Sequence, residues 1–133
     1  MIKEEIRSYR QYKAYRNRLN DRLDTLWYEL TGVKGIRYDK AHFNADPSVT
    51  EERRLVLLDK VTLIETELAR VESQIDHIDR LLSAMPKEDR KLVTYTLIDG
   101  NTYRQAEDVF YITYSAIARK VDRILDNANR CIG

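Results

Sequence analysis

The sequence predicts an all-α protein in which a long antiparallel helical hairpin, coiled-coil-like in its pattern, is followed by three shorter helices. Two long segments repeat apolar residues at alternating spacings of three and four, which is typical of helices with one buried face. The prolines and the internal glycines fall between the segments that show this period. No segment alternates apolar and polar residues as a half-buried strand does.

Residues 2–30 are the first predicted helix, and with no Gly or Pro before Gly32 they are expected to form a single helix. Arg16 interrupts an apolar stripe that consists of Ile2, Tyr9, Tyr12, Leu19, Leu23, Leu26 and Leu30. Residues 32–47 lack a helical period and hold two glycines and one proline, which predicts a loop. Three large side chains favour a loop pinned to the helices over a mobile one: Ile36, Tyr38 and Phe43.

A second long helix is predicted to begin at Ser48, because Ser48 and Glu51 have the spacing of a capping box. Its stripe is the strongest periodic signal in the chain and consists of Leu57, Val61, Ile64, Leu68, Val71, Ile75, Ile78, Leu82 and Met85. The helix can fold back on the first one through the loop. The same residues suit an intrachain hairpin or the seam of a homodimer, and the sequence leaves both open.

Three shorter helices are predicted after Pro86, which ends the second long helix. The first covers about residues 87–99 and ends at Gly100, a left-handed terminator; its inward side chains are Leu92, Val93, Tyr95 and Leu97. The next begins at a second capping box, Thr102 with Gln105, and ends near Phe110, with Val109 and Phe110 inward. Thr113 caps the last, from Tyr114 to about Asn129, whose apolar side is Ile117, Val121, Ile124 and Leu125.

The lengths of these helices and the tight turn at 111–112 predict a trihelical helix-turn-helix. We therefore divide the chain into a hairpin, residues 1–85, which is a candidate oligomerisation arm, and a helix-turn-helix DNA-binding domain, residues 86–133. In this motif the last helix enters the major groove of DNA. The side chains expected to contact DNA are those of Thr113, Tyr114, Ser115, Ala118, Arg119, Lys120 and Arg123.

Each of these side chains has chemistry suited to DNA. Arg119 can donate two hydrogen bonds to a guanine edge, and Ser115 can bond a base edge or a phosphate. Lys120, Arg123 and Arg130 can hold backbone phosphates. Asp122 also points outward in this prediction and should disfavour a phosphate nearby.

Composition and charge restrict the other functions. The 133 residues carry 23 Lys and Arg against 22 Asp and Glu, a formal net charge of +1, so any nucleic-acid contact must depend on local charge. The single cysteine, Cys131, excludes an intramolecular disulfide and fits a reducing cytoplasm. No apolar run is long enough to span a bilayer, and the first residues lack the core of a signal peptide. We expect a cytoplasmic protein with no membrane partner.

Other candidate sites in the sequence are weaker. His42 and His77 are distant in sequence and have no thiolate cluster, so no metal site is predicted. Neither a nucleophile with a partner nor a phosphate-binding glycine loop is present, so we expect no enzyme and no cofactor. Basic residues surround Tyr9, Tyr12 and Tyr15, which suits either a nucleic-acid surface or, more often, an amphipathic helix with inward tyrosines.

A family resemblance is carried by Leu92, by the runs Leu97–Tyr103 and Val109–Ser115, and by Ile117 and Val121. From Leu92 to Ile124 the chain resembles region 4 of bacterial sigma factors and the helix-turn-helix of phage late-transcription regulators of the ArpU/RinA type. The layout of a helical first half, a loop with Gly35–Lys40, a long charged helix and Met85-Pro86 is similar to the phage proteins over nearly the whole chain. Glu107 and Tyr111 stand where the family favours a small residue and a glycine, and Ala106 is expected to supply the small contact.

The resemblance implies a function. It is that of a phage-encoded, sequence-specific regulator that binds double-stranded DNA and acts on late genes in a bacterial host, with RNA polymerase as a further partner. One alternative is the DNA-recognition small subunit of a phage packaging terminase. Another is an adaptor that binds RNA polymerase or a repressor and does not bind DNA. A plain helical tail over residues 87–129 is the structural alternative.

Overall fold

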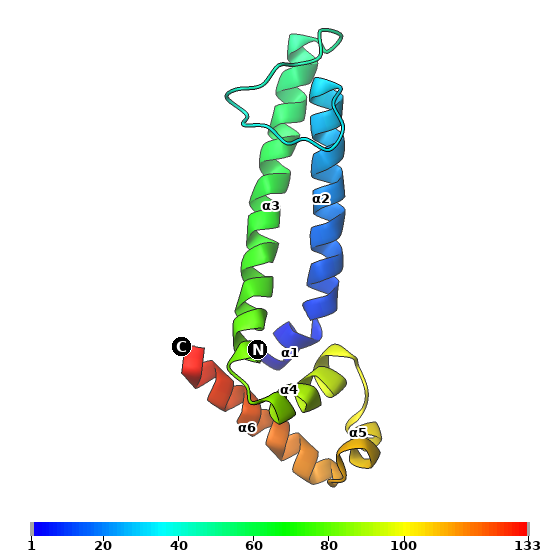
Figure 1. The fold of residues 1–133 in the computed structure, drawn as a ribbon, viewed down its shortest axis with the longest axis vertical. Coiled ribbons are helices and arrows are strands. Elements are labelled where there is room, and N and C mark those ends of the chain that lie inside the picture. Colours follow the sequence, from blue (N-terminus) through cyan, green and yellow to red (C-terminus); the bar gives the residue numbers. More distant parts are fainter. Residues whose placement is uncertain (1, 133) are drawn as a thin grey trace. The chain divides into compact units, whose positions relative to one another are not determined.

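The computed structural model of the chain describes residues 2–132, which fold into helices joined by turns and one long loop (Figure 1). The all-α prediction is confirmed: no β-strand occurs in this range, apart from an isolated bridge between Asp39 and His42. None of the described helices combines the length and the apolar character needed to cross a membrane. The elements are α1 (Ile2–Arg7), α2 (Tyr9–Thr31), α3 (Glu51–Ser83), α4 (Lys87–Val93), the π-helix η1 (Thr94–Ile98), α5 (Tyr103–Phe110) and α6 (Tyr114–Ile132).

The chain forms two compact units. Lys13–Ser73 form one, which we call the hairpin unit, and Met1–Tyr12 with Gln74–Gly133 form the other, which we call the terminal unit. The terminal unit therefore adds the first helix and the last turns of α3 to residues 86–133. That residues 86–133 are a domain by themselves stays a prediction.

The first predicted helix is interrupted at Ser8, which separates α1 from α2. The Ser8 hydroxyl donates to the Glu4 carbonyl oxygen at 3.0 Å, and the Ser8 N–H is shared between the carbonyls of Glu4 and Glu5. A serine side chain that bonds the preceding turn of its own helix bends that helix. The expectation of one continuous helix over 2–30 is wrong, and the shared Ser8 N–H marks the break.

In the hairpin unit α2 and α3 lie side by side (Figure 1). Their apolar stripes are buried within the single chain, so an intrachain hairpin accounts for the pattern. The Tyr15 hydroxyl donates to Glu67 Oε1 at 3.1 Å across the pair. The buried residues of this unit are Leu19, Leu23, Leu26, Trp27, Leu30, Leu57, Val61, Ile64, Leu68 and Val71.

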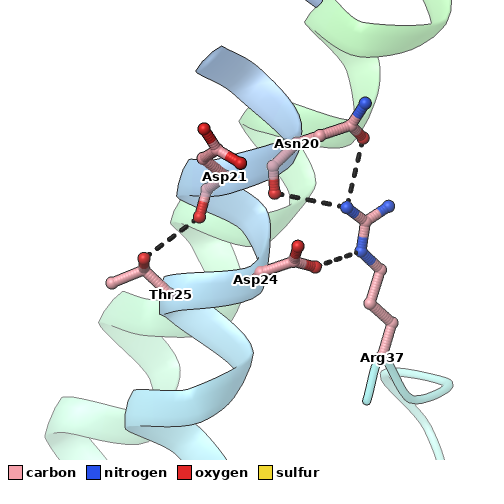
Figure 2. Close-up of polar contacts among 5 residues, drawn as sticks. All are labelled: Asn20, Asp21, Asp24, Thr25 and Arg37. Carbon is pink, nitrogen blue, oxygen red and sulfur yellow. Dashed lines mark hydrogen bonds and ion pairs between the residues drawn. The ribbon is translucent and has the colours of Figure 1, made fainter. Parts of the chain in front are cut away.

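Aromatic contacts pin the loop after α2 to the hairpin, as predicted. Tyr38 and Phe43 pack on Trp27, with ring centroids 5.8 and 5.3 Å away. Ile36 does not take part, since it is 47% exposed. Figure 2 shows a polar tie that the sequence did not suggest: Arg37 donates to Asp24 Oδ1 at 2.7 Å and to the backbone and side-chain oxygens of Asn20.

The cap of α3 lies two residues later than predicted. Thr50 Oγ1 accepts the N–H of Arg53 at 3.1 Å, and the helix begins at Glu51. Ser48 is not available as a cap, because its N–H and its hydroxyl both donate to Asp46 Oδ1 at 2.9 Å. The predicted capping box of Ser48 with Glu51 is therefore wrong.

The inward face of α3 changes near its end. Leu81 is fully buried and Leu82 is only half-buried, although the heptad pattern assigns Leu82 to the stripe. In the terminal unit Ile78, Leu81 and Met85 share one core with residues of α4, η1, α5 and α6. These last turns thus face a different set of helices from the turns before them.

The segment 87–99 is not one α-helix, because its second half widens into η1. The Asp99 N–H bonds the Thr94 carbonyl five residues earlier at 2.8 Å. Leu92, Val93 and Leu97 are buried as predicted, and Tyr95 packs partly buried beside them. Gly100 ends the segment with φ +79°, as expected of a left-handed terminator.

Candidate nucleic-acid interface

The candidate interface is built by α5, the turn after it and α6. Thr102 and Gln105 form the predicted capping box at the start of α5, and Ala106 is fully buried, which supplies the small contact. Phe110 packs edge-on against Tyr95, with centroids 5.6 Å apart. Val109 was expected inward but is 50% exposed, because α5 turns its Ala106 face to α6 and η1.

The turn closes at Tyr111 in a left-handed conformation, with φ 57° and ψ 38°. Its N–H donates to the Glu107 carbonyl oxygen at 2.9 Å, which ends α5. Among residues 2–132, Tyr111 is the one non-glycine residue with a positive φ, and its side chain is 90% exposed. The backbone here therefore has the shape for which the resembled family uses glycine.

The start of α6 is held by two side chains. Thr113 Oγ1 accepts the N–H of Ala116 at 3.4 Å, so the predicted cap is confirmed. A Glu107 carboxylate oxygen accepts the N–H of Tyr114. A carboxylate at this position also interacts favourably with the positive end of the helix dipole. In the sequence Glu107 stands out only as a departure from the resembled family, whereas in the structure it joins α5 to α6.

The predicted contact residues lie on the side of α6 that faces away from the core. Ile117, Val121, Ile124 and Leu125 are buried as expected, and α6 continues to Ile132, beyond the predicted end. The exposed residues among those predicted to contact DNA are Thr113, Tyr114, Ser115, Arg119 and Arg123, while Ala118 and Lys120 are half-buried at the flanks. The helical period thus brings Ser115, Arg119 and Arg123 onto one face.

Arg119 and Asp122 determine the charge of that face. Arg119 Nε donates to the Ser115 carbonyl oxygen at 3.3 Å, which orients the side chain along the helix. Asp122 Oδ1 accepts a hydrogen bond from Lys3 Nζ at 2.9 Å, and this hydrogen bond raises the pKa of Lys3 above its usual value. The pair offsets the negative charge that was expected to disfavour phosphate. Nothing local in the sequence indicates it, because Lys3 is in α1.

Tyr114 stands at the first turn of α6 between two neighbours from α5. Its ring meets Tyr103 edge-on with centroids 5.8 Å apart, and the Arg104 guanidinium carbon lies 5.9 Å from its centroid. The ring is still 48% exposed. It therefore presents an aromatic surface beside a cation, in a fixed position.

The tyrosines near the N-terminus pack in the fold. Tyr9 and Tyr12 lie partly buried on the core of the terminal unit, and Tyr15 bonds Glu67. Arg10 pairs with Asp99 of the same unit. The alternative of an amphipathic helix with inward tyrosines agrees with these contacts.

The remaining candidates have no partners of the required kind. Between Ile2 and Ile132 no group of three or more histidine, cysteine or acidic side chains is arranged to hold a metal ion. His77 lies 3.6 Å from a Glu5 oxygen, His42 lies 3.8 Å from an Asp39 oxygen, and Cys131 is exposed. Comparison of the chain with protein-family models, curated proteins and solved structures gives no match.

Proposed function

We propose that this protein is a sequence-specific regulator of transcription that binds double-stranded DNA with the exposed face of α6. The observation that carries the proposal is the geometry of α5, the left-handed turn at Tyr111 and α6, which leaves Ser115, Arg119 and Arg123 together on an outward helix face. One such helix fits the major groove, where base edges differ between all four base pairs.

The residues divide by role. Arg119 bonds the edge of a guanine, and Ser115 bonds a base edge or a phosphate. Thr113, Lys120 and Arg123 contact the backbone, which fixes the position of the helix without specifying sequence. Tyr114 packs against the sugar-phosphate chain beside them, and the small side chain of Ala118 allows close approach.

The biological setting of the proposal comes from the resemblance to ArpU/RinA-type regulators. On that basis the chain is a phage protein that acts on late genes in the cytoplasm of a bacterial host, with RNA polymerase as a second partner. The net charge of +1 is compatible with this role, because the outward face of α6 supplies the local positive charge.

The test is a selection from a pool of random duplexes by the full chain, at two salt concentrations, followed by sequencing of the retained DNA. We expect a motif to be enriched. With Arg119→Ala, the DNA should still be retained, but the preference at one position of the motif should be lost. The reason is that a contact to a base contributes about 1–3 kcal/mol of discrimination against the wrong base. An unchanged motif would remove Arg119 as a base contact.

Two other outcomes separate the alternatives. A ring of many copies in light scattering, together with DNA binding, would indicate a terminase small subunit. Retention that is absent at both salt concentrations would contradict DNA binding and favour the adaptor.

A further inference from the structure

A second cationic feature lies in the terminal unit beside the start of α6. It is a groove of about 400 Å³ lined by Arg7 of α1, Thr96 of η1, Asn101 to Arg104, and Tyr114. Tyr114 therefore belongs both to this groove and to the first turn of α6.

The two arginines of the groove are free to bind an anion. Neither Arg7 nor Arg104 forms an ion pair with a carboxylate of the described residues, and Arg104 contacts only the face of Tyr114. No acidic side chain is among the residues that line the groove. The groove thus holds two positive charges, and none of its lining residues carries a negative one.

We propose that this groove binds a phosphate of the DNA backbone, held by Arg7 and Arg104, so that α1 is part of the DNA interface. The inference deepens the proposed function and depends on it. Guanidinium groups suit this ligand because their N–H donors match two phosphate oxygens. A phosphate held here would lie next to the α6 turn that carries Ser115, as expected for the strand that borders the groove entered by α6.

Side chains, and not the start of α5, provide the binding chemistry. The N–H of Thr102 donates to Gln105 Oε1 at 2.8 Å, and the N–H of Gln105 donates to Thr102 Oγ1 at 3.1 Å, so the capping box already uses these groups. The Tyr103 hydroxyl is a buried side-chain polar atom without a hydrogen bond within residues 2–132. Because this hydroxyl is buried, the binding chemistry of the groove rests on Arg7 and Arg104.

The test measures the salt dependence of binding to a duplex that carries the selected motif. The logarithm of the binding constant falls with the logarithm of salt concentration by about 0.9 for each phosphate neutralised. For the full chain with Arg7→Gln and Arg104→Gln together, we expect a slope shallower by about 0.9, with sequence preference unchanged. The matched control is Arg22→Gln with Lys60→Gln, which removes two positive charges from exposed positions in the hairpin unit and should leave the slope unchanged.

The outcomes separate this inference from the proposed function. If the wild type binds DNA and Arg119→Ala loses its preference while the double variant keeps the wild-type slope, only the groove assignment is overturned. An equal change in the control with Arg22→Gln and Lys60→Gln would also overturn it, because general charge would then be the cause. If the wild type binds no duplex at low salt, the proposed function fails first.

A second experiment tests whether the groove takes a free phosphate instead of one from DNA. Inorganic phosphate is titrated into the full chain, and its binding is monitored by NMR. Binding that depends on Arg7 and Arg104, together with an unchanged DNA slope, would assign the groove to a free phosphate ligand and contradict the proposal. Both arginines are exposed and unpaired, so the variants should melt as the wild type does. A conservative Arg104→Lys variant, which keeps the charge, should keep the slope.

Discussion

The turn between α5 and α6 depends on Tyr111, whose left-handed backbone is unfavourable for a residue with a side chain. Its side chain is almost fully exposed, so packing does not compensate for the strain. The turn forms because the surrounding contacts require it: Glu107 accepts the N–H groups of both Tyr111 and Tyr114. Glu107 thus joins α5 to α6.

Tyr111→Gly should therefore stabilise the protein. Removing the side chain from a left-handed backbone position raises the free energy of unfolding by about 1–2 kcal/mol. The greater freedom of glycine in the unfolded chain lowers that gain by about 0.5–1 kcal/mol. Gly100→Ala is the reverse change, because it adds a Cβ at a left-handed position: φ is +79°, and no atom lies within 4 Å of the added Cβ. This variant should lose about 1 kcal/mol. Urea unfolding of both variants is the measurement, and a loss in Tyr111→Gly would contradict the account.

At the scale of elements, the heptad pattern predicts the hairpin but not the end of α3. The pattern assigns Leu82 to the buried stripe, whereas Leu81 is the residue that enters the core of the terminal unit. A periodic pattern reports the face that is apolar, and both leucines satisfy it. Which of them is buried depends on the helices after Pro86, whose positions the local sequence does not encode.

Leu81→Ala and Leu82→Ala test this assignment. Removing a fully buried leucine leaves a cavity and costs about 2–5 kcal/mol, so Leu81→Ala should lower the unfolding free energy by that amount. Leu82→Ala should lower it markedly less, because that side chain is already half-exposed. Equal losses in chemical denaturation would show that the core is assigned wrongly.

The Glu67 carboxylate of α3 in the hairpin unit predicts a pH dependence, chiefly through Arg70 of the same helix. Hydrogen bonds from Arg70, and then from Tyr15, hold the pKa of Glu67 below its usual 4.5, while burial acts in the opposite direction. A carboxylate with a lowered pKa stabilises the fold at pH values above its unfolded pKa, and this contribution disappears as the pH falls through the folded pKa.

Glu67→Gln should accordingly be less stable than the wild type near pH 7, and the difference should shrink as the pH is lowered below about 4.5. Thermal melts from pH 7 to pH 3 measure it. Glu72→Gln is the control, since Glu72 is exposed in the middle of the same helix, and it should show little change. A difference that is constant over this range would exclude the Glu67 contacts as its cause.

Local signals explain what the sequence could predict. Capping chemistry identified Thr102, Gln105 and Thr113, and glycine identified the stop at Gly100, because each acts within a few residues. The same chemistry failed at Ser48, where a competing local bond to Asp46 takes the hydroxyl. The helical period also placed Ser115, Arg119 and Arg123 on one exposed face. The pairing of Lys3 with Asp122 and the groove at Arg7 join distant segments, so no local pattern could reveal them.

At the scale of the whole molecule, the terminal unit joins the first and last parts of the chain. Ile6 of α1 is fully buried in the core that contains Ile78, Leu92, Ile117 and Val121. The helix that carries Lys3 and Arg7 is therefore anchored beside α6, and not an appended arm. This arrangement allows α1 to contribute charge to the surface formed by α5 and α6.

Fluorescence anisotropy tests whether the surface formed by α5 and α6 binds duplex DNA. A labelled duplex carrying the selected motif is titrated with the full chain at two salt concentrations. We expect saturable binding that weakens steeply as salt is raised, since phosphates are neutralised on binding, and a weaker preference for the motif in Arg119→Ala. The absence of binding at the lower salt concentration, by a protein that melts cooperatively, would contradict DNA binding by this surface.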